Sequence, residues 1–199
     1  MSDQPGGTVT DDIGRSGAIA ALEGAHPLDT LHLDPTHRVG DFSCSKSERV
    51  TRFLREQAQD WMERRYCGVF IFPNPADPAV VWGYYTLSQF VVARDDMRNK
   101  DKNRQLLQTV PLAQIGFMGK ADGTPTGLGA ILLTDAARRV YRSLDIPAWG
   151  ITLEPERGKD NPKLWAWYQR AGFIELKSNP NRMYASYEKL IPELGNAVS

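Results

Sequence analysis

The chain has 199 residues, and its 24 basic and 24 acidic side chains give a formal net charge of zero. This balance excludes a protein that binds nucleic acid through overall basicity, so any such contact must come from a local patch. With 41% hydrophobic and 24% charged residues, the composition is typical of a globular protein, at a length suited to one domain. No apolar stretch approaches the ~20 residues of a membrane span, and the N-terminus lacks a signal-peptide pattern. We therefore expect a cytoplasmic protein that makes no membrane contact.

The first 40 residues differ from the rest of the chain. Every Phe, Tyr and Trp lies at or after Phe42, and a segment without aromatic residues contributes little to a core. We therefore expect residues 1–40 to form a flexible or loosely docked arm and residues 41–199 to form the folded domain. All three histidines lie in the arm, so the domain has no imidazole for a Ser-His-Asp triad or an ordinary zinc site, and we expect no metal.

Residues 47–66 carry apolar side chains at three- and four-residue steps, which predicts an amphipathic helix capped by Ser45 or Ser47. Cys44 and Cys67 flank this helix, so a disulfide between them is not expected. Two neighbouring strands follow at 67–72 and 79–90, joined by a proline-rich turn, and we expect the charged segment 94–104 to be a solvated loop.

The second half of the chain alternates strands with helices. We expect a strand at 109–118, a glycine-rich turn, a helix from 127, a strand at 149–153 and a helix at 161–171. Gly172 suits the left-handed position after that last helix, and two strands, at 173–176 and 182–187, close the chain. The predicted fold class is therefore α/β, with a mixed sheet covered by helices.

The turn before the predicted helix at 127 could carry chemistry. Unpaired N–H groups at a helix start can bind a pyrophosphate, and Gly127-Leu128-Gly129 supplies that arrangement. No Lys-Ser or Lys-Thr follows, as a P-loop requires, and the third glycine and acidic residue of the Rossmann pattern are missing. On these residues alone, a plain helix start is as good an interpretation as a phosphate site.

A later segment makes the interpretation specific. The run Asn161-Pro-Lys-Leu164-Trp-Ala-Trp-Tyr168-Gln-Arg-Ala-Gly172-Phe173 resembles the signature of GNAT acyltransferases, and Gly127 and Gly129 fit the two glycines of that family's earlier turn. The resemblance is narrower still to the GNAT toxins of bacterial type II toxin–antitoxin pairs, which acetylate the free amino group of aminoacyl-tRNA. The segments that carry it are Phe42-Ser43-Cys44, 53–58, 80–88, 110–118 and Met183-Tyr184.

The resemblance implies the GNAT fold, a mixed and mostly antiparallel sheet flanked by helices, with acetyl-CoA as cosubstrate. Its candidate catalytic residue is Tyr168, whose hydroxyl would sit beside the cofactor sulfur and donate a proton to the departing thiolate. The implied cofactor-binding residues hold the pantetheine arm or the pyrophosphate: Met118, Gly119, Lys120, Thr124, Thr126, Gly127, Leu128, Gly129, Ala130 and Asn161.

We therefore expect an N-acetyltransferase that acts on a primary amine. The resemblance suggests the amino group of aminoacyl-tRNA as acceptor, a small antitoxin as partner, and a homodimer. Two alternatives stay open: an enzyme for a small amine or a protein N-terminus, and a degenerate GNAT domain that serves as an interaction module. The second arises because Thr124, Pro125 and Lys120 depart from the family pattern. Glu154 is either a base or a solvated strand end, and Tyr84 either packs or lines the acceptor cleft.

Overall fold

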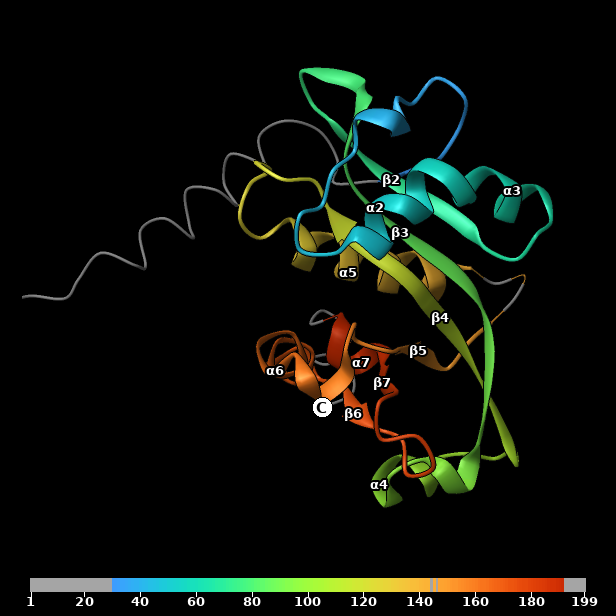
Figure 1. Ribbon diagram of the computed structural model, residues 1–199. Coiled ribbons are helices and arrows are strands. Elements are labelled where there is room, and N and C mark those ends of the chain that lie inside the picture. Colours follow the sequence, from blue (N-terminus) through green and yellow to red (C-terminus); the bar gives the residue numbers. More distant parts are fainter. Residues whose placement is uncertain (1–29, 144, 146, 192–199) are drawn as a thin grey trace, which may run out of the picture.

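The computed structural model describes residues 30–143, 145 and 147–191. These residues form a seven-stranded sheet in the order β1-β2-β3-β4-β5-β7-β6, flanked by helices (Figure 1). Only β4 and β5 are parallel neighbours, so the predicted class of a mixed, mostly antiparallel sheet is confirmed. The strands are β1 Leu31–His32, β2 Gly68–Asn74, β3 Asp77–Ala93, β4 Thr109–Lys120, β5 Gly150–Leu153, β6 Ile174–Glu175 and β7 Met183–Ser186.

The helices of the described residues cover both faces of this sheet. The α-helices are α2 Glu48–Arg52, α3 Ala58–Glu63, α4 Asn99–Lys102, α5 Leu128–Arg142, α6 Pro162–Arg170 and α7 Tyr187–Leu190. Short 3-10 turns lie at η1 Val39–Asp41, η3 Arg94–Asp96 and η4 Gly158–Asp160, and η2 Phe53–Gln57 is a π-helical turn. None of these helices is long and apolar enough to span a membrane.

The helix expected at 47–66 is present, with a π turn in its middle. Ser47 caps it, since its hydroxyl accepts a hydrogen bond from the Val50 N–H at 3.2 Å. Within η2, the Ala58 N–H donates to the Phe53 carbonyl five residues earlier. The wider turn brings Phe53, Leu54 and Ala58 together into the core.

Neighbouring residues of β3 face opposite layers of the molecule. Tyr84 points to the layer formed by α2, η2 and α3, whereas Tyr85 points to the layer formed by α5, α6 and α7. Both side chains are fully buried. This alternation is the two-residue period of a strand that is covered on both sides.

A β-bulge in β4 changes which residues face which layer. Tyr85 pairs with Met118 but Leu87 pairs with Ile115, so Thr86 lies opposite two residues. The Thr86 hydroxyl accepts a hydrogen bond from the Phe117 N–H at 3.0 Å. Beyond the bulge, Phe117 packs under α2 and Met118 packs under α5. The extra residue therefore re-aims the end of β4.

The segment 94–104 is more ordered than a solvated loop, which corrects that expectation. It contains η3 and α4, and Asp101 is only 3% exposed because it accepts a hydrogen bond from the Tyr184 hydroxyl at 3.0 Å. The same hydroxyl accepts from the Arg98 N–H at 2.9 Å. A buried carboxylate in an otherwise charged run has no local sequence signal, because its partner lies 83 residues away.

Neither β1 nor α7 was expected from the sequence pattern. Residues 30–33 lie along β2, where the Leu33 N–H donates to the Val69 carbonyl at 2.9 Å. Residues 1–29, the greater part of the expected arm, lie outside the described residues. Cys44 and Cys67 are both free thiols, as expected.

Candidate functional site

The two parallel strands at the centre of the sheet separate at the bulge. β4 and β5 pair at three positions, the last being Ile115 with Leu153. β5 ends there, while β4 continues to Lys120 alongside β3. Residues 116–120 therefore have no β5 partner for the backbone groups on that side. In Figure 1, α5 lies above β5 and α6 lies to the lower left of β5.

The start of α5 offers unpaired donors to open space. Gly127 adopts the left-handed conformation, with φ +95°, which favours glycine. Its carbonyl accepts from the Ala130 and Ile131 N–H groups. The Leu128 and Gly129 N–H groups precede these two in the first turn and have no acceptor in the described chain. A side chain added at Gly127 or Gly129 would meet no atom within 4 Å. This geometry suits an anion such as a phosphate group.

The turn between β4 and α5 is held from both ends. Lys120 donates from its ammonium group to the Thr124 carbonyl and hydroxyl, each at 3.1 Å. Asp122 accepts hydrogen bonds from Ser45 and Ser43, and the Ser45 hydroxyl is the main reason that the pKa of Asp122 lies below its usual range. Thr124 thus stabilises the turn internally, and Lys120 holds its ammonium group on the turn that leads into α5.

Tyr168 lies in the core between α6 and the rest of the α5 layer. Its side chain is 6% exposed, and its ring packs edge-on against Trp167 and Phe173, with centroid separations of 4.8 and 5.6 Å. Its hydroxyl has no hydrogen-bond partner among the described residues, and burial raises its pKa, so the group stays protonated. Leu128 and Met118 belong to the same core cluster. Tyr168 thus shares a core cluster with one residue of each predicted binding segment.

The other candidate residues differ in their packing, hydrogen bonds and exposure. Asn161 caps α6, accepting from the Leu164 N–H at 3.3 Å, which leaves its amide NH₂ for another partner. Gly119 lies directly against Val50 of α2, whose side chain occupies the space that a side chain at 119 would need. Leu128 is fully buried, so only its backbone can face a ligand. Thr126 and Ala130 are exposed at the mouth of the turn.

Glu154 and Tyr84, each of which had two possible interpretations, both have hydrogen-bond partners within the protein. Glu154 accepts from Arg182 at 2.9 Å and from Asn179 at 3.0 Å, so its carboxylate is committed to these partners. Tyr84 is fully buried and donates its hydroxyl hydrogen to the Val50 carbonyl at 2.7 Å, so it packs and lines no cleft. Among the residues that the structure describes, no three metal-ligating side chains come together.

Thr86 was not anticipated, although its hydroxyl holds the bulge at which the opening begins. A buried threonine inside a strand is common, so the role of Thr86 becomes visible only in the register between β3 and β4. The sequence signal for the bulge itself is the Ile115-Gly116-Phe117 run, in which a glycine interrupts a strand pattern.

Comparisons of the whole fold find close likenesses among solved structures. AtaT complexed with acetyl-methionyl-tRNAfMet matches with a TM-score of 0.71 and 19% identity, over 85% of this chain and 98% of that one. An AtaT Tyr-to-Phe mutant bound to acetyl-CoA and the C-terminus of the antitoxin AtaR matches with a TM-score of 0.65 and 20% identity, over 83% and 97% of the two chains. A Tyr-to-Phe mutant of KacT matches with a TM-score of 0.64 and 20% identity, over 79% and 92%.

No family model matches the sequence, and the search of curated proteins found no significant match. AtaT and KacT are GNAT toxins of type II toxin–antitoxin systems. At identities near 20%, the likeness establishes the fold. The chain therefore has the GNAT fold that these toxins share.

Proposed function

We propose that this protein transfers the acetyl group of acetyl-CoA to a primary amine. One observation carries the proposal. The Leu128 and Gly129 N–H groups at the start of α5 and the Tyr168 hydroxyl have no partner in the described chain, and Leu128 and Tyr168 belong to the same core cluster.

The residues present fit acetyl-CoA. The amides of Leu128 and Gly129 would bind the pyrophosphate, aided by the nearby ammonium group of Lys120. The backbone of residues 118–120, which β5 leaves unpaired, would hydrogen-bond the pantetheine arm, and the Asn161 amide would contact it. Pro125 offers no N–H, but it precedes the left-handed Gly127 and takes no donor from α5.

Acetyl-CoA supplies a thioester carbonyl whose carbon–sulfur bond can be broken by an amine. As the new carbon–nitrogen bond forms, the leaving sulfur takes up negative charge. The Tyr168 hydroxyl would donate its proton to that sulfur. The acceptor nitrogen would release one proton to solvent, and the tyrosinate would take one proton back from solvent. Since burial raises the pKa of Tyr168, this group holds its proton over the whole physiological range.

The acceptor that we propose is the amino group of an aminoacyl-tRNA, with a small antitoxin as the protein partner. The complexes of AtaT with acetyl-methionyl-tRNAfMet and with AtaR support this choice. The basic patch that RNA requires is modest, because Arg64 pairs with Asp60 and Arg104 pairs with Glu188. Arg49, whose guanidinium lies 4.7 Å over the Phe117 ring, enters no ion pair among the described residues. We also propose a cytoplasmic homodimer with residues 41–199 as its catalytic domain.

Calorimetry with acetyl-CoA tests the first step, because every catalytic version requires that binding. The acceptor is then tested with radiolabelled acetyl-CoA and methionyl-tRNA, with spermidine and an N-terminal peptide as competing acceptors. Labelled RNA supports the toxin, whereas label on the small amine alone supports the first alternative. No heat of binding at millimolar acetyl-CoA would leave only the non-catalytic module.

A further inference from the structure

One stretch of β3 forms a free edge of the sheet. β2 pairs with β3 only as far as Gly68 opposite Leu87, whereas β3 continues to Ala93 and pairs there with β4 alone. In the described part of the chain, no strand lies on the outer side of residues 88–93. Figure 1 shows this lower part of β3 at the margin of the sheet, below the start of β2.

The backbone of this edge points outward at alternate residues. Pro111 pairs with Val91, and its carbonyl accepts from the Trp149 N–H at 2.8 Å on the β5 side. Val91 therefore directs its own N–H and C=O away from β4. Arg94 confirms the alternation, since its N–H donates to the Gln108 carbonyl at 2.8 Å. Gln89, Val91 and Ala93 consequently present three unpaired N–H and C=O pairs at the edge.

This edge lacks the features that normally block strand addition. Natural edge strands carry charged residues, prolines or bulges that prevent another chain from pairing with them. Residues 88–93 contain neither a charge nor a proline, and their register with β4 is regular. Val91 is 59% exposed. An edge of this kind is suited to receive an extended peptide.

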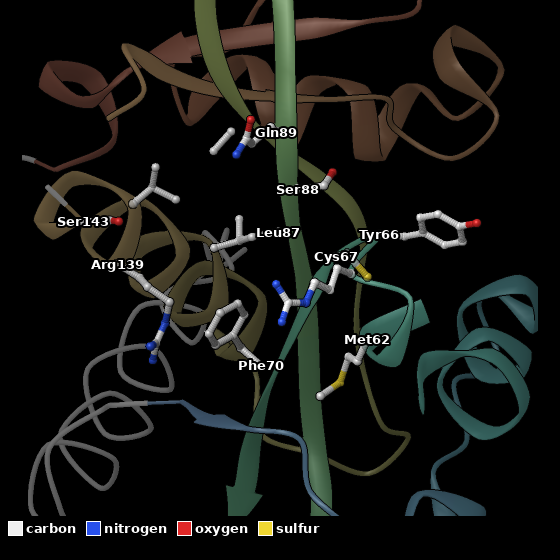
Figure 2. Close-up of a pocket in the computed structure, with 13 residues that line it drawn as sticks. Met62, Tyr66, Cys67, Phe70, Leu87, Ser88, Gln89, Arg139 and Ser143 are labelled. Carbon is white, nitrogen blue, oxygen red and sulfur yellow. The ribbon is translucent and has the colours of Figure 1, made fainter. Parts of the chain in front are cut away.

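A groove of about 720 Å³ continues from the edge where β2 begins. Figure 2 shows Leu87, Ser88 and Gln89 of β3 running between two walls, one with Met62, Tyr66 and Cys67 and the other with Arg139 and Ser143. The charged residues that line it are Arg65 and Arg139, with no acidic residue among the lining. Arg139 approaches Asp135 at 4.0 Å, whereas Arg65 enters no ion pair among the described residues.

We propose that this edge and groove bind an extended segment of a partner protein as an added strand. The segment runs antiparallel to β3 in the line of β2, bonds to Gln89, Val91 and Ala93, and places an acidic end in the groove against Arg65. The surface is separate from the proposed acetyl transfer. It lies beside the last turns of α5, roughly 18 Å from Gly127 at the 1.5 Å rise of a helix.

Two substitutions at one position separate backbone docking from side-chain effects. Val91→Pro removes an N–H that bonds to nothing in the described chain, so the β3–β4 ladder stays intact while strand addition is blocked. Val91→Thr keeps the N–H and the branched shape. The probe is a fluorescein-labelled peptide, Thr-Val-Thr-Val-Thr-Val-Glu-Glu, compared with a version that ends in Lys-Lys. We expect the acidic peptide to bind the native protein and Val91→Thr on the order of tenfold more tightly than Val91→Pro. The Lys-Lys version and Arg65→Ala should each weaken binding by a similar factor.

Amide hydrogen exchange in the native protein gives a second, independent measurement. Without peptide, the N–H groups of Gln89, Val91 and Ala93 should exchange quickly and those of Phe90 and Val92 slowly. Saturating peptide should slow the first set by at least about tenfold. Unchanged exchange at millimolar peptide, or equal affinity for all variants, overturns the proposal. Protection without peptide that grows with protein concentration, together with a dimer in light scattering, assigns the edge to a second copy and overturns the proposed occupant. Loss of acetyl-CoA binding would leave these outcomes unchanged.

Discussion

Phe53 and Phe117 lie face to face, with ring centroids 3.8 Å apart and ring planes inclined by 13°. This contact joins the π turn η2 to the residue that the β4 bulge directs toward the helices. Trp61 packs edge-on against both rings, with centroid separations of 5.3 Å from Phe53 and 6.1 Å from Phe117. The opening between β4 and β5 is thus supported from the opposite face of the sheet.

Replacing Phe117 by Ala should therefore destabilise the protein by about 2–4 kcal/mol, since it deletes a stacked ring and leaves Phe53 unsupported. Urea unfolding monitored by tryptophan fluorescence measures this change. Leu107→Ala serves as control, because Leu107 is 63% exposed and should alter stability by less than about 0.5 kcal/mol. Equal effects of the two substitutions would show that the stack contributes nothing specific.

Tyr168→Phe tests the proposed proton donor. The hydroxyl has no partner in the described chain, so its removal should leave the melting temperature and acetyl-CoA affinity nearly unchanged while acetylation slows by roughly 10²–10⁴-fold. The control is Tyr187→Phe, whose hydroxyl is buried without a partner and belongs to α7. That variant should keep full activity. A Tyr168→Phe enzyme with native turnover would remove this residue from the mechanism.

Gly129→Ala separates stability from binding at the start of α5. No atom lies within 4 Å of the added methyl group, and alanine favours a helix over glycine, so stability should rise by up to about 1 kcal/mol. The same methyl projects beside the proposed pyrophosphate, and acetyl-CoA affinity should fall about tenfold in calorimetry. Gly119→Ala should have the opposite effect on stability, a loss of about 1–3 kcal/mol, because the added methyl group collides with Val50. Unaltered affinity in Gly129→Ala would argue against a phosphate at this turn.

A buried network at the edge of α5 predicts a large stability effect. The Asp135 carboxylate accepts from the Thr30 and Tyr85 hydroxyls, each at 2.5 Å, and Arg139 donates to the Thr30 carbonyl at 2.7 Å. Asp135→Ala leaves the Thr30 and Tyr85 hydroxyls without their carboxylate acceptor and removes the negative charge that lies 4.0 Å from Arg139, which should cost about 2–4 kcal/mol. Asp135→Asn keeps one acceptor oxygen and should lose less. Similar melting curves for both variants would contradict the network.

Cys67 supplies a prediction with a defined pH range. Burial raises the pKa of its thiol to about 11, so the folded protein retains this proton at pH values where an unfolded thiol has lost it. The resulting stabilisation is complete below the unfolded value, near pH 9, and is lost as the pH rises toward 11. Because the thiolate is the nucleophile, iodoacetamide should label native Cys67 slowly at pH 8 and faster toward pH 11, as mass spectrometry would show. Labelling at pH 8 as fast as in urea would contradict the burial.

Periodicity was sufficient to predict most strands and helices of this fold. The helix from 127 and the helix at 161–171 emerged within a residue or two of α5 and α6, because each has a repeating apolar face and a marked end. β1 and α7 could not be found, since elements of two and four residues contain too little pattern and exist only through contacts with distant chain segments. α4 was hidden for a similar reason, as Asp101 is buried only because Tyr184 meets it.

The candidate site was predictable in outline only. Gly127 and Gly129 have a recognisable pattern, and the structure shows the open donors that the pattern indicates. The pairing of Lys120 with Thr124, and of Glu154 with Arg182, depends on the path of turns that have no periodicity. The roles of Tyr168 and Asn161 in catalysis and binding stay predictions until they are measured.

The bulge opposite Thr86 also limits how this chain can change during evolution. Losing one residue between 109 and 120 would carry the first turn of α5 to the other surface of the sheet, since each strand position alternates sides. Related genes should consequently tolerate insertions and deletions in the hairpin tip at 103–108, where Leu106 is 98% exposed, while the length of β4 stays constant.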